Sequence, residues 1–205
     1  MATKRAVYVL DDDGAVLRSL ERLLNSANFE PIIFDRPDVF LAAAKTFKTG
    51  CVLLDVHLPS MSGLEVQAQL HIMRNDLPVI VVTGKGDIHT AVRAMKAGAA
   101  DFLEKPYSDH TLLTAIEAAF ANEHRPIRDN EIADAIRRIA ILSPREREVL
   151  DGLLAGQPNK LIAYQLGISV RTVEVHRARM MERLGMRQFA EAIRLGVLAR
   201  LSRKG

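Results

Sequence analysis

Short apolar runs that end at polar residues constrain the fold of this chain most. Four of them are Ala6–Leu10, Ile32–Phe34, Cys51–Leu54 and Pro78–Val82, and Asp101–Leu103, with two apolar residues, is predicted as a fifth strand. Between these runs, apolar residues recur at the spacing of a helix, for example over a stretch from about Asp38 to Phe47. Apolar strands that alternate with amphipathic helices predict a parallel sheet with helices on both faces. The sequence therefore predicts an α/β unit with a doubly wound, five-stranded parallel sheet.

A polar, proline-containing segment at 123–129 separates this pattern from a remainder that is helical throughout. The expected helices there cover 131–141, a segment that starts at Ser143-Pro144, and then 159–166, 170–184 and 188–201. We therefore predict three parts: an α/β domain at 1–122, a linker at 123–141 that is helical from about residue 130, and a small all-α domain at 142–205.

The two halves of the chain differ in charge. Residues 1–124 carry 12 Lys and Arg against 16 Asp and Glu, a net charge of −4, whereas residues 125–205 carry 16 against 9, a net charge of +7. A basic domain favours a polyanion such as nucleic acid as its partner. Chance scatter of surface charge is the alternative, and the motifs described next argue against it.

The composition excludes several classes of protein. No apolar run approaches the roughly 18 residues that a membrane span needs, and the N-terminal run is too short for a secretory signal. The single cysteine, Cys51, excludes an intramolecular disulfide and a cysteine-rich zinc site. Its place in an apolar strand predicts a core residue. We expect a cytoplasmic protein without membrane contact.

Charged and hydroxyl side chains follow the predicted strands. Three aspartates at 11–13 follow the first strand, Asp55 the third, Thr83 the fourth and Lys105 the fifth. The carboxyl ends of parallel strands share one edge of the sheet, so we expect these residues to gather there. Converging carboxylates repel, and Mg²⁺ relieves that repulsion. A carboxylate can attack a phosphoryl group, with Lys105 and the metal balancing charge and Thr83 donating a hydrogen bond. The pattern predicts a phosphorylated aspartate.

Taken singly, each of these residues has a plainer interpretation. An Asp at a strand end usually caps a helix, and a Lys before Pro is usually a solvated loop residue. The joint pattern is more specific, because its motifs are correctly ordered: Leu-Asp-Asp-Asp, Leu-Leu-Asp-Val-His-Leu-Pro-Ser-Met-Ser-Gly, Val-Thr-Gly-Lys-Gly and Phe-Leu-Glu-Lys-Pro. For Asp13, a role at the start of the following helix is favoured over metal binding.

The basic half contains the pattern of a helix-turn-helix. Two short helices are joined by Leu166-Gly167-Ile168-Ser169, and Ser169 can cap the second helix. The helical period places on its inward face Val170, Val173, Met180, Met181 and Leu184. The opposite face mixes arginine with small side chains, which suits the major groove of DNA; it holds Arg171, Val175, Ala178 and Arg179.

Further DNA contacts are expected around this helix. Asn159 and Lys160 begin the preceding helix, where backbone amides and a lysine can hold a phosphate. Arg177 falls at the edge of the inward face, with a head that can reach a phosphate. The expected DNA-contacting set also includes Ser169, Thr172 and His176. The alternative for the second helix is a basic, solvated helix without a ligand.

On the four motifs quoted above, residues 1–122 resemble the receiver domain of bacterial two-component response regulators, which has a flavodoxin-like fold. The resemblance implies that Asp55 is the phospho-acceptor. It also implies a site for Mg²⁺ or Mn²⁺ formed by the acidic pair Asp11 and Asp12, by Asp55 and by the backbone carbonyl of His57.

The same resemblance implies the parts of a switch. Thr83 would be the switch hydroxyl, and Lys105, in a cis peptide with Pro106, would pair with the phosphate. Phe102 occupies the position of a switch aromatic, with plain core packing as the alternative. Receivers dimerise through the face of the fourth helix and fifth strand, for which the candidates here are Val92, Lys96 and Asp101.

Residues 142–201 resemble the LuxR-type effector domain, a four-helix unit, on Leu142-Ser143-Pro144-Arg145-Glu146-Arg147-Glu148-Val149-Leu150, Asn159-Lys160-Leu161-Ile162-Ala163 and Ile168-Ser169-Val170-Arg171-Thr172-Val173-Glu174-Val175-His176. A receiver followed by this effector is the architecture of the NarL/FixJ regulators. Pro-Asn-Lys, Arg-Thr-Val-Glu-Val-His-Arg and Ala-Met-Lys-Ala-Gly-Ala-Ala-Asp-Phe-Leu-Glu-Lys-Pro resemble the FixJ branch in particular.

The resemblance also implies the partners. A sensor histidine kinase, for the FixJ branch a haem-based oxygen sensor, would phosphorylate the receiver. A phosphorylated homodimer would then bind promoter DNA and act with RNA polymerase to activate transcription, in the FixJ branch of nitrogen-fixation genes.

Two other functions compete with a phosphorylation-switched transcription factor. One is a small phosphatase that uses aspartyl chemistry, which the basic half and the lack of a substrate-pocket signature in the sequence disfavour. The other is a constitutive DNA-binding protein with a vestigial receiver. The complete acidic set, together with Thr83 and Lys105, disfavours that alternative.

Overall fold

The computed structural model of the chain describes residues 4–73, 76–84, 88–121, 129–186 and 189–201. The chain divides into two compact units, residues 1–86 with 97–124 and residues 87–96 with 125–205. This division groups helix α4 (Ile88–Lys96) with the second unit, whereas the sequence places it within 1–122. The predicted domain boundaries stay a prediction. The break is expected at 123–129, and residues 122–128 lie outside the described residues.

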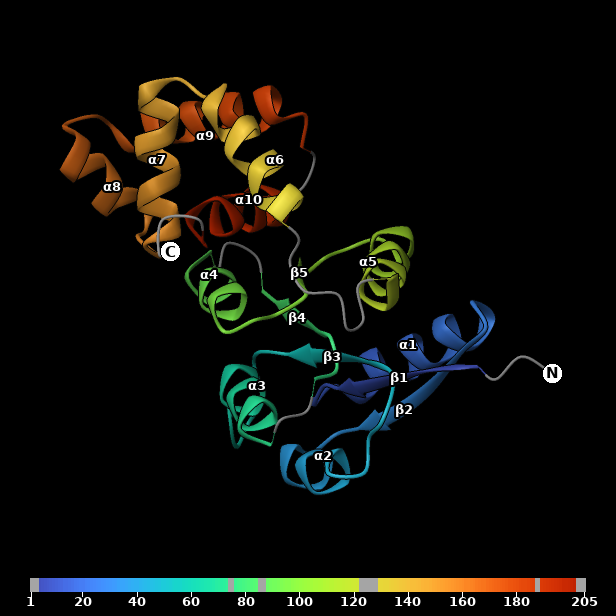
Figure 1. The fold of residues 1–205 in the computed structure, drawn as a ribbon. Helices are drawn as coiled ribbons and strands as arrows, with labels where there is room; N and C mark the ends of the chain where they lie inside the picture. Colours follow the sequence, from blue (N-terminus) through green and yellow to red (C-terminus); the bar gives the residue numbers. More distant parts are fainter. Residues whose placement is uncertain (1–3, 74–75, 85–87, 122–128, 187–188, 202–205) are drawn as a thin grey trace. The chain divides into compact units, whose positions relative to one another are not determined.

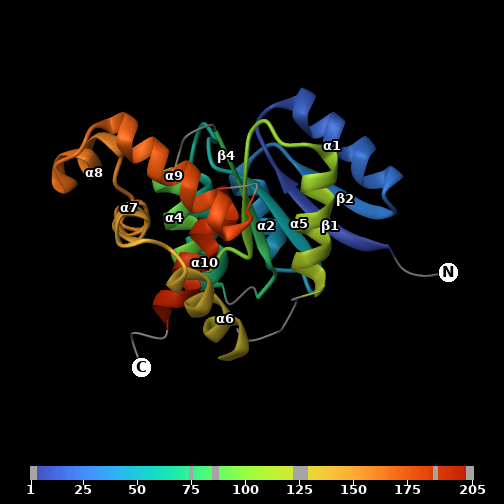
Figure 2. The same ribbon diagram turned by 90° about the horizontal axis from the view of Figure 1, so that it is seen from above.

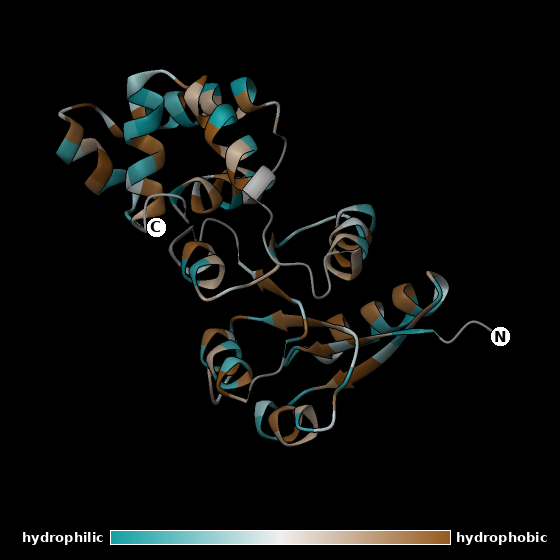
Figure 3. Ribbon diagram, viewed as in Figure 1, coloured by the Kyte–Doolittle hydropathy of each residue, from teal (hydrophilic) through white to brown (hydrophobic). Residues whose placement is uncertain are grey.

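The first unit is built on a parallel sheet with the strand order β2-β1-β3-β4-β5. Its strands are β1 (Arg5–Leu10), β2 (Phe29–Phe34), β3 (Cys51–Asp55), β4 (Val79–Thr83) and β5 (Asp101–Glu104). This order is that of the flavodoxin-like doubly wound fold, so the predicted fold class is confirmed. The strands are largely hydrophobic, as a sheet covered on both faces requires (Figure 3).

Strand β2 begins at Phe29 rather than at Ile32, where the sequence pattern places its start. The added residues include Glu30 and Pro31, which interrupt the apolar run. They are tolerated because β2 is an edge strand that pairs only with β1 in this sheet.

Helices cover both faces of the sheet (Figure 1 and Figure 2). On one face lie α1 (Gly14–Ser26) and α5 (Asp109–Ala121), and on the other lie α2 (Pro37–Ala44) and α3 (Gly63–Ile72). The core on the first face includes Leu20, Phe29, Leu53, Cys51, Ile80, Leu112 and Ile116. Burial of such apolar surface contributes about 25 cal/mol per Å² to stability. Cys51 is fully buried, which confirms its predicted core role.

Helix α2 ends at Ala44, whereas the sequence pattern extends it to Phe47. Phe47 instead lies beyond the helix and stacks on Tyr8 of β1, with 3.7 Å between the ring centroids. Phe47 is therefore apolar because its ring packs against the sheet, and not because it belongs to the helix.

The second unit is helical. Besides α4, it contains α6 (Asp129–Ala140), α7 (Pro144–Leu154), α8 (Asn159–Leu166), α9 (Val170–Leu184) and α10 (Phe189–Leu201). Ser143 and Ser169 cap α7 and α9 with their hydroxyls. Gly167 caps the C-terminus of α8, and its φ of 66° is a left-handed conformation that glycine adopts without steric penalty. Within the described residues, no helix has the length and apolarity to cross a membrane.

Candidate functional site

Two buried carboxylates meet at the carboxyl edge of the sheet. Leu10 of β1 and Leu54 of β3 pair in register, so the next residue of each strand, Asp11 and Asp55, come side by side. Their exposed fractions are only 4% and 5%. Because burial disfavours charged carboxylates, such a pair needs a cation or hydrogen-bond donors.

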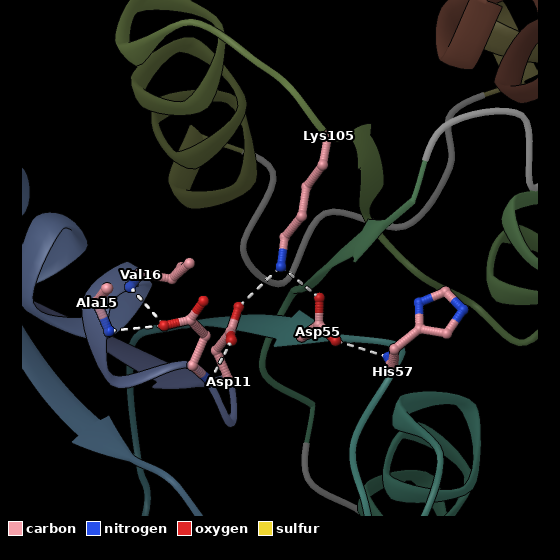
Figure 4. A network of polar contacts seen from close by, with 7 residues as sticks. Asp11, Ala15, Val16, Asp55, His57 and Lys105 are labelled. Carbon is pink, nitrogen blue, oxygen red and sulfur yellow. Dashed lines mark hydrogen bonds and ion pairs between the residues drawn. The ribbon is translucent and has the colours of Figure 1, made fainter.

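Lys105 supplies that cation. Its Nζ lies 2.7 Å from Oδ1 of Asp55 and 3.0 Å from Oδ2 of Asp11 (Figure 4). The backbone N–H of Lys105 donates to the carbonyl of Thr83 at 2.8 Å, which fixes the residue beside β4. The peptide bond to Pro106 is cis, as expected. One side chain from the end of β5 thus joins the ends of β1 and β3.

The charge of Lys105 is set by these contacts. Burial acts to lower its pKa, but the hydrogen bonds to Asp55 and Asp11 outweigh burial, and the pKa is raised above the ordinary lysine value. Lys105 is therefore an ammonium ion at neutral pH. A single positive charge then faces two carboxylates, which leaves this edge of the sheet with an excess of negative charge.

Backbone amides hold the remaining carboxylate oxygens. The N–H of His57 donates to Oδ2 of Asp55 at 2.6 Å, and the N–H of Asp13 donates to Oδ1 of Asp11 at 2.9 Å. Figure 4 shows the bond from His57 to Asp55 beside the contacts of Lys105. The two carboxylates are therefore oriented by the chain as well as by charge.

Gly63, the first residue of α3, packs directly on the end of β3. Its N–H donates to the carbonyl of Val56 at 2.9 Å, and a Cβ at this position would overlap the carbonyl oxygen of Asp55. Only glycine allows this approach. Gly63 lies within the motif that contains Asp55, but its sequence context predicted no role for it. The available signal was its place directly after Ser62, the residue that caps α3.

Thr83 and Phe102 are both buried near this edge, at the end of β4 and within β5. Thr83 is 1% exposed, and its Oγ1 has no hydrogen-bond partner among the described residues. A buried hydroxyl without a partner is unfavourable by about 1–3 kcal/mol. The hydroxyl of Thr83, at the end of β4, is therefore available to donate a hydrogen bond to a further acceptor.

The acidic run at 11–13 divides into three roles. Asp11 faces Asp55, as described above. Asp13 caps α1 and accepts from the amides of Ala15 at 2.7 Å and Val16 at 3.4 Å, which confirms its predicted role at a helix start. Asp12 is exposed. In the part of the chain that the structure describes, no three His, Cys, Asp or Glu side chains form a metal cluster, so Asp12 does not join the other two.

The recognition face predicted on α9 is open to solvent. Its residues Arg171, Val175, Ala178 and Arg179 are exposed, whereas Thr172 and His176 are half-buried. On the opposite face Val173, Met180 and Leu184 are buried. The predicted inward position of Val170 is wrong, since this residue is 41% exposed. It is the first residue of α9, where a side chain lies at the end of the helix rather than against its neighbours.

The start of α8 and the turn before α9 carry the other expected DNA contacts. Lys160 is exposed and Asn159 is half-buried. The hydroxyl of Ser169 accepts from the N–H of Thr172 at 3.0 Å, so it caps α9. Arg177 is half-buried, as its place at the edge of the inward face predicts, and its Nη1 donates to Oδ1 of Asn159 at 3.2 Å; the expected contact of its head with a phosphate is not tested by this bond. Helix phase placed Arg177 near the inward edge but did not predict its contact with Asn159.

Comparison with known protein families matches both units. Residues 7–117 match the response regulator receiver domain, and residues 140–195 match the bacterial regulatory proteins of the luxR family. The chain is 42% identical to the transcriptional regulatory protein FixJ of Bradyrhizobium diazoefficiens over 200 residues, which cover 97% of this chain and 98% of that protein. This chain belongs to the NarL/FixJ-type response regulators.

Other similar proteins support the same family. FixJ of Rhizobium meliloti is 41% identical over 95% of this chain and 96% of that protein, and the response regulator protein TodT of Pseudomonas putida is 39% identical over 92% and 84%. The crystal structure of full-length FixJ from B. japonicum matches 98% of this chain and 99% of that chain at 41% identity, with a TM-score of 0.58. As a member of this family, the chain is a two-component response regulator that controls transcription, not a classical enzyme.

The residues expected to form the dimer of this response regulator differ in exposure. Val92 is buried, Lys96 is exposed and Asp101 is half-buried. A carboxylate oxygen of Asp101 accepts from the N–H of Phe102 at 2.9 Å. The dimer surface stays a prediction, in which Lys96 is the most accessible of the three side chains.

Proposed function

We propose that this response regulator is switched by phosphorylation of Asp55 and that the phosphorylated chain dimerises and binds promoter DNA. The observation that carries the proposal is the pair of ion contacts from Lys105 to the buried carboxylates of Asp55 and Asp11. Such a site holds a carboxylate nucleophile beside a fixed cation, which is the combination that phosphoryl transfer needs.

In the transfer, an oxygen of Asp55 attacks the phosphorus of a phosphohistidine in the sensor kinase. The new bond joins that oxygen to phosphorus, and the bond to the histidine nitrogen breaks, with its electron pair going to the imidazole. Lys105 already lies 2.7 Å from an oxygen of Asp55, so its ammonium group is close to the nucleophile and would pair with the incoming phosphoryl oxygens. The N–H of His57 keeps the carboxylate oriented during the attack.

The excess negative charge at this edge fits a divalent cation. Mg²⁺ prefers one or two carboxylates, with water or phosphate oxygens completing its shell. Asp11 and Asp55 supply buried carboxylates, and we assign Asp12 and the backbone carbonyl of His57 as further ligands. Mg²⁺, or Mn²⁺ in its place, would supply positive charge to the phosphoryl oxygens. Asp12 is exposed, so its part in the site requires a change of side-chain position.

The switch acts through Thr83 in this proposal. Its buried hydroxyl lacks a partner among the described residues and is available to donate to an oxygen of the phosphoryl group. Movement of Thr83 would change the space around Phe102, which is buried in the neighbouring strand β5. We infer that this change alters the surface that includes Val92, Lys96 and Asp101 and favours a homodimer.

A twofold dimer places two copies of α9 on two half-sites of DNA. The exposed Arg171, Val175, Ala178 and Arg179 are suited to the major groove, with Thr172 and His176 at its margin. Lys160 and Asn159 are suited to a backbone phosphate. Ser169 holds the start of α9. RNA polymerase would be the next partner at the promoter, and the site of action would be the cytoplasm.

The finer biological role follows the names of the similar proteins. FixJ and nodulation protein W point to nitrogen fixation and nodulation. The response regulator protein TodT, at 39% identity to this chain, is about as similar as nodulation protein W. We propose control of nitrogen-fixation genes under a haem-based oxygen-sensing kinase. Deletion of this regulator should then lower the transcripts of those genes at low oxygen, and unchanged transcripts would contradict this assignment while leaving the phosphorylation switch intact.

The phosphorylation site itself can be tested directly. The chain is incubated with acetyl phosphate and Mg²⁺, and acid-labile phosphate is measured on the unaltered chain and on Asp55→Asn. The variant keeps the size of the side chain and removes its nucleophilic carboxylate. We expect phosphate on the unaltered chain only. Equal phosphate on Asp55→Asn would place the acceptor elsewhere.

A further inference from the structure

The guanidinium group of Arg177 is held by two neighbouring helices. Its Nη1 donates to Oδ1 of Asn159 at the start of α8, at 3.2 Å. Its Cζ lies 4.6 Å from the centre of the Phe189 ring at the start of α10. A planar guanidinium can stack on a ring and donate in its own plane at the same time, whereas lysine cannot. Arg177 therefore ties the middle of α9 to the first residues of α8 and α10.

The contact fixes the side chain of Asn159. Arginine only donates hydrogen bonds, so the atom of Asn159 that faces it is the carbonyl oxygen. The amide nitrogen of Asn159, with its two N–H groups, is thereby kept for another acceptor. A phosphate oxygen is such an acceptor, and side-chain amides are frequent phosphate contacts in protein–DNA complexes.

The start of α8 is otherwise suited to this role. Helix α8 follows Pro158, which provides no side-chain cap, whereas serines cap α7 and α9. Lys160 is the next residue and is exposed. Arg177 and the exposed Val175 and Ala178 belong to one helix, so the bond to Asn159 also sets the spacing between the start of α8 and the predicted recognition face.

We propose that Arg177 is a positioning residue for DNA recognition, which acts by holding Asn159 with its amide donors toward a backbone phosphate and does not contact DNA itself. This inference rests on the proposed DNA binding. It assigns Arg177 a different role from Arg171 and Arg179, whose side chains are exposed on the recognition face. A phosphate contact by Arg177 itself is the competing explanation.

A double-mutant cycle separates the two explanations. The full chain, phosphorylated with acetyl phosphate and Mg²⁺, is titrated on a duplex that the unaltered chain has selected from random-sequence DNA. We compare Arg177→Ala, Asn159→Ala and the double variant, after thermal unfolding has shown that each is folded. We expect each single change to weaken binding about five- to tenfold and the double change to weaken it no further, because both remove one shared contact. Multiplicative losses would overturn the proposal.

The salt dependence gives a second, independent readout. Loss of a charge that pairs with a phosphate lowers the slope of log K against log salt by about 0.9. We expect a much smaller change for Arg177→Ala, and a change near one for the comparator Lys160→Ala. Arg177→Lys should bind as weakly as Arg177→Ala, since lysine keeps the charge and loses the planar contact. Full binding by Arg177→Lys, or a slope lower by one in Arg177→Ala, would identify a direct phosphate contact.

Asn159→Asp tests the donor itself. The carboxylate keeps an acceptor for Arg177, so the variant should unfold at or above the temperature of the unaltered chain. It lacks the amide donors and should bind DNA at least tenfold more weakly. Unchanged binding by this variant would overturn the proposal. If the unaltered chain selects no DNA sequence at all, the DNA-binding function itself fails, and the role of Arg177 fails with it.

Discussion

The ammonium group of Lys105 lies 2.7 Å from a carboxylate oxygen of Asp55, and the two side chains come from strand ends 50 residues apart in the chain. The same ammonium group reaches Asp11 at 3.0 Å. Among the described residues, Lys105 is the only cation paired with these two carboxylates. It lies where a transferred phosphoryl group would need a positive charge.

Replacement of Lys105 should destabilise the first unit. In Lys105→Met, two buried carboxylates lose their cation, and we expect a loss of about 1–2 kcal/mol, less than for a fully buried pair because Lys105 is one-third exposed. Added Mg²⁺ should restore more stability to this variant than to the unaltered chain. Urea unfolding with and without Mg²⁺ measures both effects. The control is Lys48→Met at an exposed position; equal stability of the two variants would argue against the ion contacts.

Replacement of Thr83 should have opposite effects on the stability of the fold and on the phosphorylation switch. Thr83→Val replaces a buried hydroxyl that has no partner among the described residues, so the free energy of unfolding should rise by about 1 kcal/mol. The variant should still accept phosphate on Asp55, and its DNA binding should no longer respond to it. Thr83→Ser keeps the hydroxyl and serves as the control for the response. Destabilisation of Thr83→Val would show that the hydroxyl has a partner in solution.

Addition of a single methyl group at Gly63 should destabilise the first unit. In Gly63→Ala the new Cβ overlaps the backbone of Asp55, and we expect a loss of about 1–3 kcal/mol together with slower phosphorylation. Gly14→Ala is the matched control, because the nearest atom there is the flexible end of Arg18 at 3.3 Å. Denaturant unfolding and phosphorylation rates of both variants give the comparison. A neutral Gly63→Ala would mean that α3 does not approach β3 this closely.

Glu146 should make the second unit sensitive to acid. Its carboxylate is 2% exposed; burial acts to raise its pKa, but hydrogen bonds from the amide and hydroxyl of Ser143, with the charges of Arg183 and His176, lower the pKa below its ordinary value. A lowered pKa stabilises the fold above the unfolded value of about 4.3, and the gain is lost as pH falls through the folded value.

The measurement for this prediction is hydrogen exchange of the α7 amides as a function of pH. Glu146→Gln should speed exchange at pH 7, and the difference from the unaltered chain should shrink below about pH 4 as the native carboxylate becomes protonated. Glu148→Gln alters an exposed pair with Arg145 and should have little effect at any pH. A difference for Glu146→Gln that persists undiminished at low pH would exclude the charge as its cause.

The sequence predicts the five parallel strands and the edge of the sheet at which the site forms, because apolar periodicity and strand-end polar residues are local signals. Asp11, Asp55 and Lys105 therefore gather as expected. The sequence pattern fails where tertiary packing determines the position of a residue. Phe47 reads as helical but stacks on Tyr8 of β1, and the approach of Gly63 to Asp55 depends on how α3 lies on the sheet.

The same limit applies to the helical unit. Helix phase separates Val173 from Val175 correctly, because the two lie well inside α9. It misplaces Val170 at the end of the helix, and it gives no indication that the head of Arg177 meets Asn159, 18 residues away. The helical spacing of apolar residues indicates which face of a helix a residue lies on. It does not indicate the rotamer of the side chain or its partner on another helix.

In the proposed switch, phosphate on Asp55 controls DNA binding by the basic unit. The most direct test is the affinity of the full chain for its selected duplex, with and without acetyl phosphate in the presence of Mg²⁺, for the unaltered protein and for Asp55→Asn. We expect the phosphodonor to tighten binding of the unaltered protein at least tenfold and to leave Asp55→Asn at the unphosphorylated level. An equal response in both proteins, or no response in the unaltered protein, would contradict the account.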